Sequence, residues 1–112
     1  MATCEELAAM LTANQTQLAM ANSSLNSTNL SIASTSLGIL GSDPGAIVPL
    51  TAGNVAIRMA QLAMQTPPNY PLLGQYAALA GLLSLWAATT AQIAYIQLTI
   101  LGIEQSMANQ NC

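Results

Sequence analysis

Charged side chains are nearly missing from this sequence. Its 112 residues include no histidine, no lysine and no phenylalanine, and the formally charged residues are Glu5, Glu6, Asp43, Arg58 and Glu104. These make up 4% of the chain, whereas about 25% is usual for soluble domains. Because charge hydrates a surface and keeps copies apart, we expect this surface to be covered by a membrane, by copies of the chain or by attached sugar.

The missing residue types exclude most enzyme chemistry. General acid–base and nucleophilic catalysis near neutral pH relies on His, a tuned carboxylate, Lys or Cys beside a partner group. Glu5 and Glu6 are adjacent, so on a helix they point about 100° apart. They suit a helix N-terminus better than a paired acid site. We therefore predict no enzymatic activity, no catalytic residues and no small-molecule substrate.

The same inventory predicts no cofactor and no metal site. Two cysteines without a histidine cannot complete a four-ligand zinc site within one chain. The sequence contains no phosphate loop, no GxGxxG and no nucleophile elbow. One arginine and a net charge of −3 exclude the basic surface that binds nucleic acid.

The composition predicts an all-α fold. Hydrophobic residues make up 53% of the chain and aromatics only 4%, so the apolar content is mostly Ala, Leu, Ile and Met, which form helices well. Gly, Pro, Ser and Asn cluster at 38–50 and 67–71 and mark breaks. We predict a single domain, 1–112, with long helices at about 4–39 and 71–108 joined through a short helix at about 51–65.

Local signals support the predicted helix starts. Thr3 is a candidate N-cap with Glu6 three residues later, as in a capping box, and Thr51 is the candidate cap of the short helix. Segment 22–36 is rich in Ser, Thr and Asn, which compete for backbone hydrogen bonds. We expect it to be disordered in an isolated chain.

Each long helix carries large side chains at a seven-residue period, which predicts coiled-coil-like lengthwise packing. Two interpretations stay open, an ordinary helical core and a seam between copies of the chain. The seam would comprise Leu11, Leu18, Leu25, Ile32 and Ile39 in the first helix, and Leu79, Trp86, Ile93, Ile100 and Met107, after Leu72, in the third.

The third helix has a second apolar flank beside this series. The flank consists of Leu73, Tyr76, Ala77, Ala80, Leu83, Ala87, Ala91, Ala94, Leu98 and Leu101. A helix that is apolar around most of its girth is buried on most sides. The short helix spans less than half the length of the long ones, so we expect another copy of the chain to cover the rest.

We predict a structural protein, the self-assembling subunit of a homopolymeric filament, ribbon, tube or shell whose partner is itself. Low charge favours this function, because copies repel each other little and few ions are desolvated on packing. The alternative is a small integral membrane protein with 72–103 as the spanning helix, since that run is charge-free and longer than the ~20 residues needed. Gln75, Gln92 and Gln97 weaken this alternative, because a lipid-facing amide is costly.

Four Asn-x-Ser/Thr patterns begin at Asn14, Asn22, Asn26 and Asn29 and are candidate glycosylation sites. A segment rich in these residue types also produces such patterns by chance. If glycosylated, the chain would form a sugar-coated extracellular fibre.

The two cysteines, Cys4 and Cys112, stand near the two ends of the sequence. If the long helices are antiparallel, the thiols can close an internal disulfide. If the helices are parallel, a crosslink can form only between copies. The third alternative is two reduced thiols in the cytoplasm.

The N-terminal sequence is acidic and lacks the basic and apolar segments of a cleavable secretory signal. Both a cell-surface or extracellular fibre and a cytoplasmic assembly stay open. The charge-poor composition and the run Ala87-Ala88-Thr89-Thr90-Ala91 resemble the small subunits of bacterial R-bodies, which build coiled cytoplasmic ribbons. The resemblance covers only this run and the composition, and the break at 67–71 and the terminal cysteines depart from it.

Overall fold

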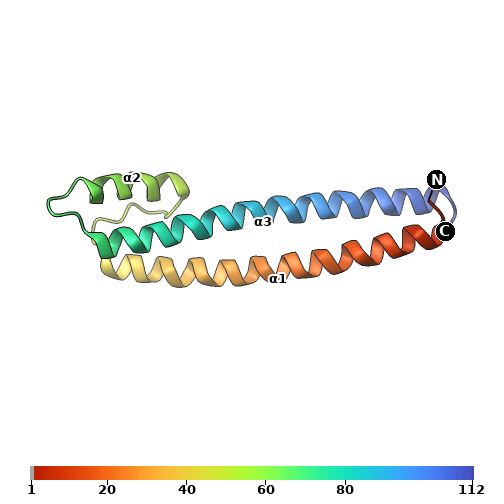
Figure 1. Cartoon of the computed structure of the whole chain (residues 1–112), viewed down its shortest axis with the longest axis horizontal. Coiled ribbons are helices and arrows are strands. Elements are labelled where there is room, and N and C mark those ends of the chain that lie inside the picture. The colour runs from red at the N-terminus through yellow and green to blue at the C-terminus, as the bar shows by residue number, and fades with distance from the viewer. Residues whose placement is uncertain (1) are drawn as a thin grey trace. The chain divides into compact units, whose positions relative to one another are not determined.

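The computed structural model describes residues 2–112 and contains three helices, α1 (Cys4–Ser42), α2 (Ala52–Ala63) and α3 (Tyr70–Asn109) (Figure 1). No strand occurs in this described part of the chain. The predicted all-α fold, with two long helices and a short one between them, is confirmed.

The chain forms two compact units, and α1 and α3 both contribute to each. The terminal unit comprises residues 1–26 and 88–112, and the central unit comprises residues 27–87. In each unit α1 and α3 run antiparallel (Figure 1). The prediction of a single domain, 1–112, stays a prediction.

The core of the central unit draws on all three helices. Its buried side chains are Ile39, Val55, Leu62, Leu72, Tyr76 and Leu79. Val55 and Leu62 are one heptad apart, so both lie on the inner face of α2. α2 thereby covers the first turns of α3.

The core of the terminal unit is a simpler two-helix seam. It contains the buried side chains Ala21, Ile93 and Ile96, packed with the half-buried Leu18, Leu25 and Ile100. Burial of Leu7 and Ile103 extends the apolar interior toward the chain termini.

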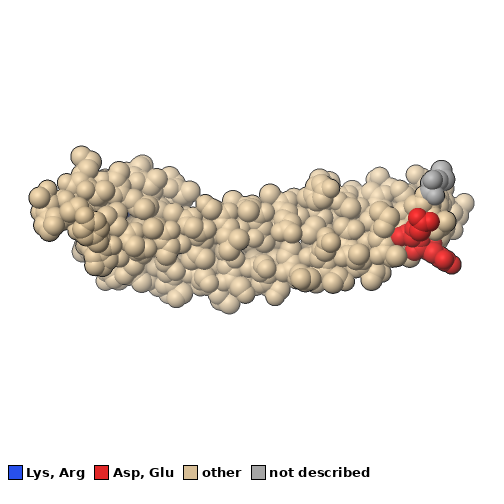
Figure 2. Space-filling view, in the orientation of Figure 1, with Lys and Arg blue, Asp and Glu red and all other residues tan. Residues whose placement is uncertain are grey.

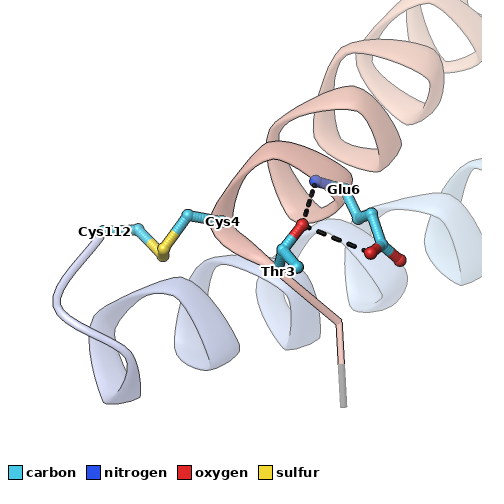
Figure 3. Close-up of a disulfide and its surroundings, with 4 residues drawn as sticks. All are labelled: Thr3, Cys4, Glu6 and Cys112. Atoms are coloured by element: carbon cyan, nitrogen blue, oxygen red, sulfur yellow. Dashed lines mark hydrogen bonds between the residues drawn. A yellow bond between two sulfur atoms is a disulfide. The ribbon is translucent and has the colours of Figure 1, made fainter.

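Side-chain caps account for the helix starts. Thr3 Oγ1 accepts a hydrogen bond from Glu6 N at 3.1 Å and donates one to Glu6 Oε1 at 3.3 Å (Figure 3). Thr51 Oγ1 accepts from Asn54 N at 3.2 Å, which confirms the predicted cap of α2. Asn69 Oδ1 accepts from Leu72 N at 3.2 Å, so α3 starts earlier than predicted.

α1 covers the predicted range of about 4–39 and extends slightly beyond it. The helix continues to Ser42, because Asp43 N still donates to Ile39 O at 2.8 Å. Segment 22–36 is helical throughout, and its expected disorder in an isolated chain stays a prediction. Its inward positions, the buried Thr28 and the half-buried Leu25 and Ile32, supply packing that outweighs the poor local propensity.

A disulfide joins the two ends of the terminal unit. Cys4 and Cys112 are bonded, with their Cα atoms 5.6 Å apart (Figure 3). After α3, Asn111 adopts the left-handed conformation (φ 57°), Asn111 N donates to Ala108 O and Cys112 N donates to Met107 O. This Schellman motif turns the chain toward Cys4, so the structure shows the internal alternative, with no free cysteine in residues 2–112.

We expect the double substitution Cys4→Ser and Cys112→Ser to lower the free energy of unfolding by about 3–5 kcal/mol. The disulfide closes a loop of about 100 residues and restricts the unfolded chain accordingly. Urea unfolding monitored by circular dichroism measures the change. Adding reductant to the wild type is the control and should reproduce it, and an unchanged unfolding midpoint in both experiments would contradict the prediction.

Candidate functional site

A buried polar cluster in the central unit links the loop after α1 to α2 and α3. Asp43 follows α1, and its side chain is 1% exposed. Its carboxylate accepts hydrogen bonds from Arg58 Nε at 2.8 Å, from Arg58 Nη2 at 2.7 Å and from the Tyr76 hydroxyl at 2.6 Å. Gly45 N donates to it at 3.0 Å. The carboxylate therefore has partners from its own loop and from two helices.

Gly45 leaves room for the Arg58 guanidinium in this cluster. A Cβ atom on Gly45 would lie 2.6 Å from Arg58 Nη2 and 2.9 Å from Arg58 Cζ. Two hydrogen bonds to Asp43 fix the guanidinium there, so it cannot withdraw without losing them. Arg58 Nη1 also donates to Gln61 Oε1 at 3.1 Å. Because glycine has no side chain, position 45 leaves the space that the Asp43–Arg58 ion pair needs.

Hydrogen bonding and burial set the protonation of the cluster. Hydrogen bonds from Arg58 lower the pKa of Asp43 to about 2, with smaller contributions from Tyr76 and Gly45. Burial, followed by the hydrogen bond to Asp43, raises the pKa of Tyr76 to about 12. The bond to Asp43 raises the pKa of Arg58 above its usual value. The ion pair is therefore formed over the physiological range.

This cluster is a structural clamp rather than a reactive group. The carboxylate already accepts four hydrogen bonds, and its lowered pKa makes it a weak base. From the sequence, only Glu5 and Glu6 were considered as a possible acid pair, and this cluster was not predicted. The available signal was that Arg58 is the only cation and Asp43 the only acid in the middle of the chain. Within residues 2–112 no three His, Cys, Asp or Glu side chains gather as metal ligands.

Most of the predicted seam residues pack in the cores of the two units, namely Ile32, Ile39 and Leu79 in the central unit and Leu18, Leu25, Ile93 and Ile100 in the terminal unit. Ile39, Leu79 and Ile93 are buried. Trp86 is 42% exposed, and the remaining seam residues, Leu11, Leu18, Leu25, Ile32, Ile100 and Met107, are half-buried. The ordinary helical core therefore accounts for this periodicity. A further role between copies stays a prediction.

The candidate glycosylation sites differ in accessibility. Asn14 is half-buried, and its Nδ2 donates to Met10 O at 2.8 Å. Asn22, Asn26 and Asn29 are exposed along α1. The latter three can reach solvent, and their modification stays a prediction.

The outer surface exposes large apolar side chains but few charges. Leu30 and Leu37 on α1 are 73% and 70% exposed, and Tyr95 and Leu98 on α3 are 72% and 68% exposed. Figure 2 shows acidic atoms confined to the end of the terminal unit that carries the chain termini, with uncharged atoms elsewhere on that face. Because Asp43 pairs with Arg58, the central unit has no unpaired charged side chain.

Comparison with models of protein families, with curated proteins and with solved structures finds no match to this chain.

We expect the stability of the protein to be highest between about pH 4 and pH 10. The lowered pKa of Asp43 stabilises the fold above its unfolded value of 3.8, and this contribution, about 2 kcal/mol, is lost as the pH falls through about 2. The raised pKa of Tyr76 stabilises the fold below 10, and that contribution is lost as the pH rises toward 12. Urea unfolding across this range tests both limits. Tyr76→Phe should abolish the alkaline loss, and an unchanged alkaline loss in this variant would contradict the assignment.

We expect Gly45→Ala to destabilise the central unit by about 1–3 kcal/mol, because the new methyl group displaces the guanidinium from Asp43. The matched control is Gly53→Ala in the first turn of α2, where a Cβ has no neighbour within 4 Å. That change should stabilise the protein by up to about 1 kcal/mol. Thermal unfolding compares the two, and equal effects would contradict the close contact.

Proposed function

We propose that this chain is a structural protein, the self-assembling subunit of a homopolymer. The observation that carries the proposal is the combination of exposed apolar side chains and missing surface charge. Apart from the Asp43–Arg58 pair, the charged side chains are Glu5, Glu6 and Glu104, all in the terminal unit. A surface with so few charges repels other copies of the chain only weakly.

The exposed apolar residues follow the same heptad spacing as the cores. On α1 of the central unit, Leu30, Ala33, Leu37 and Leu40 recur at intervals of three and four residues and are all exposed. Earlier on the same helix face the corresponding positions are Thr16, Ala19, Ser23 and Asn26. The apolar stripe is therefore local to the second half of α1. Such a stripe suits a further helix packed lengthwise.

The disulfide indicates the kind of compartment in which such a polymer would form. Disulfides persist in oxidising compartments and are rare in the cytoplasm. The Cys4–Cys112 bond therefore favours an extracellular or cell-surface fibre over an R-body-type cytoplasmic ribbon. It also favours non-covalent contacts between copies, since both thiols are already used.

A membrane protein is the second candidate. Among the described residues, α3 is long and apolar enough to cross a bilayer by length and composition. However, α1 packs beside α3 in both units, and between residues 22 and 36 its exposed face is mainly Asn and Ser. Insertion of the pair would carry these polar side chains into lipid at high cost, so we favour assembly in water.

We expect the purified, oxidised chain to form ordered filaments, ribbons, tubes or shells without detergent. Negative-stain electron microscopy tests this directly. Because few charges are present, the amount of polymer should change little between low and high salt. Featureless grids, with protein recovered only from detergent-solubilised membranes, would instead support the membrane candidate. A steep loss of polymer at high salt would contradict the uncharged contact.

A further inference from the structure

A second heptad stripe on α3 lies in the terminal unit. The α3 outer stripe consists of Ala91, Ala94, Leu98 and Leu101, spaced by three, four and three residues. Leu98 is 68% exposed, Leu101 is 51% exposed, and both alanines are exposed. The core residues of this segment, Ile93, Ile96 and Ile100, occupy other positions of the heptad. The stripe therefore takes no part in the intrachain seam.

The order of side-chain sizes makes the α3 outer stripe complementary to itself in one orientation. Read along the helix, two alanines precede two leucines. If two copies lie antiparallel about a two-fold axis level with Ile96, Ala91 faces Leu101 and Ala94 faces Leu98. Each of the four layers then pairs one Leu with one Ala, and large side chains fill the spaces above small ones. Parallel pairing would oppose leucine to leucine and alanine to alanine.

Charge favours the same orientation. Residues 88–103 include no charged side chain, and Glu104 follows directly. In a parallel pair the two Glu104 carboxylates would stand at the same level along the helices, on opposite flanks of the contact. In the antiparallel pair they lie about 24 Å apart along the helix axes, well beyond the screening length of about 8 Å.

The flanking polar residues favour a second copy over lipid. In the antiparallel register, the two-fold axis places Gln97 of one copy beside Gln97 of the other on the same flank of the stripe. Two amides can hydrogen-bond across such a contact. In a bilayer, Gln97, which is exposed, would face hydrocarbon at a cost.

We propose that the α3 outer stripe binds the same stripe of a second copy, giving an antiparallel, two-fold symmetric dimer contact. Such a contact is isologous, and this inference rests on the proposed homopolymer, of which it supplies one of the contacts. Another surface must link the dimers into a polymer. The exposed stripe of Leu30, Ala33, Leu37 and Leu40 on α1 is available for that link.

A size-swap experiment tests the register. Ala94→Leu places two leucines opposite each other, and Leu98→Ala places two alanines opposite each other. Each single change should weaken the dimer about tenfold or more, and the double variant should restore affinity to near the wild-type value. Sedimentation equilibrium of the full oxidised chain measures the dissociation constant. Additive losses in the double variant, or a stronger dimer for Ala94→Leu alone, would overturn the antiparallel register.

A charge substitution tests the surface itself. Leu98→Asp should weaken the dimer about 100-fold or more, since it buries two unpaired carboxylates. Gln17→Asp, on the exposed face of α1 in the same unit, is the matched control and should leave dimerisation unchanged. Circular dichroism and a non-reducing gel establish that both variants stay folded and disulfide-bonded. Unchanged dimerisation of Leu98→Asp would overturn the proposal, as would a monomeric wild type that binds only to phosphatidylcholine vesicles.

The electron micrographs separate this inference from the proposed function. Dimers sensitive to Leu98→Asp without any polymer would support the contact and reject the homopolymer. Polymers that form equally well with Leu98→Asp would support the homopolymer and reject the contact.

Discussion

Antiparallel pairing of α1 with α3 is the interaction on which both units depend. In the terminal unit it supplies the whole core, with Ala21 packed among Ile93 and Ile96. In the central unit it provides the platform of Ile39, Tyr76 and Leu79 that α2 covers. Because the large side chains recur every seven residues, both helices keep an apolar face inward over their length. Even the Ser- and Asn-rich middle of α1 is helical on that basis.

The pairing of Arg58 with Asp43 keeps the central unit electrically neutral. A chain with one cation and four carboxylates could leave them all in solvent. Instead, Arg58 and Asp43 form an ion pair, and the Tyr76 hydroxyl donates a hydrogen bond to the same carboxylate. An ion pair buried in this way costs desolvation, and its satisfied hydrogen bonds offset that cost. The pair fixes α2 and the preceding loop to the long helices, and it leaves the central unit without a net charge that would oppose close contact.

Sequence patterns predicted the elements well because their causes are local. Clustered Gly and Pro residues predicted the breaks between the helices, and Thr3 and Thr51 predicted two helix N-caps. The heptad periodicity predicted which faces of the long helices point inward. The direction of pairing was open, because an apolar stripe fits a parallel or an antiparallel neighbour equally well. The Asp43 cluster was missed, since it joins residues 15 and 33 positions apart in the sequence through a loop whose path no periodic pattern encodes.

Closure of the Cys4–Cys112 bond makes the chain between these residues a covalent ring. A protease that cuts the exposed segment after α2, at Met64, Gln65 or Thr66, breaks one peptide bond and releases nothing. The two pieces stay attached through the sulfurs, and each retains its place in the helix seam. A single nick in this segment therefore leaves the whole mass of the chain in one covalently linked molecule.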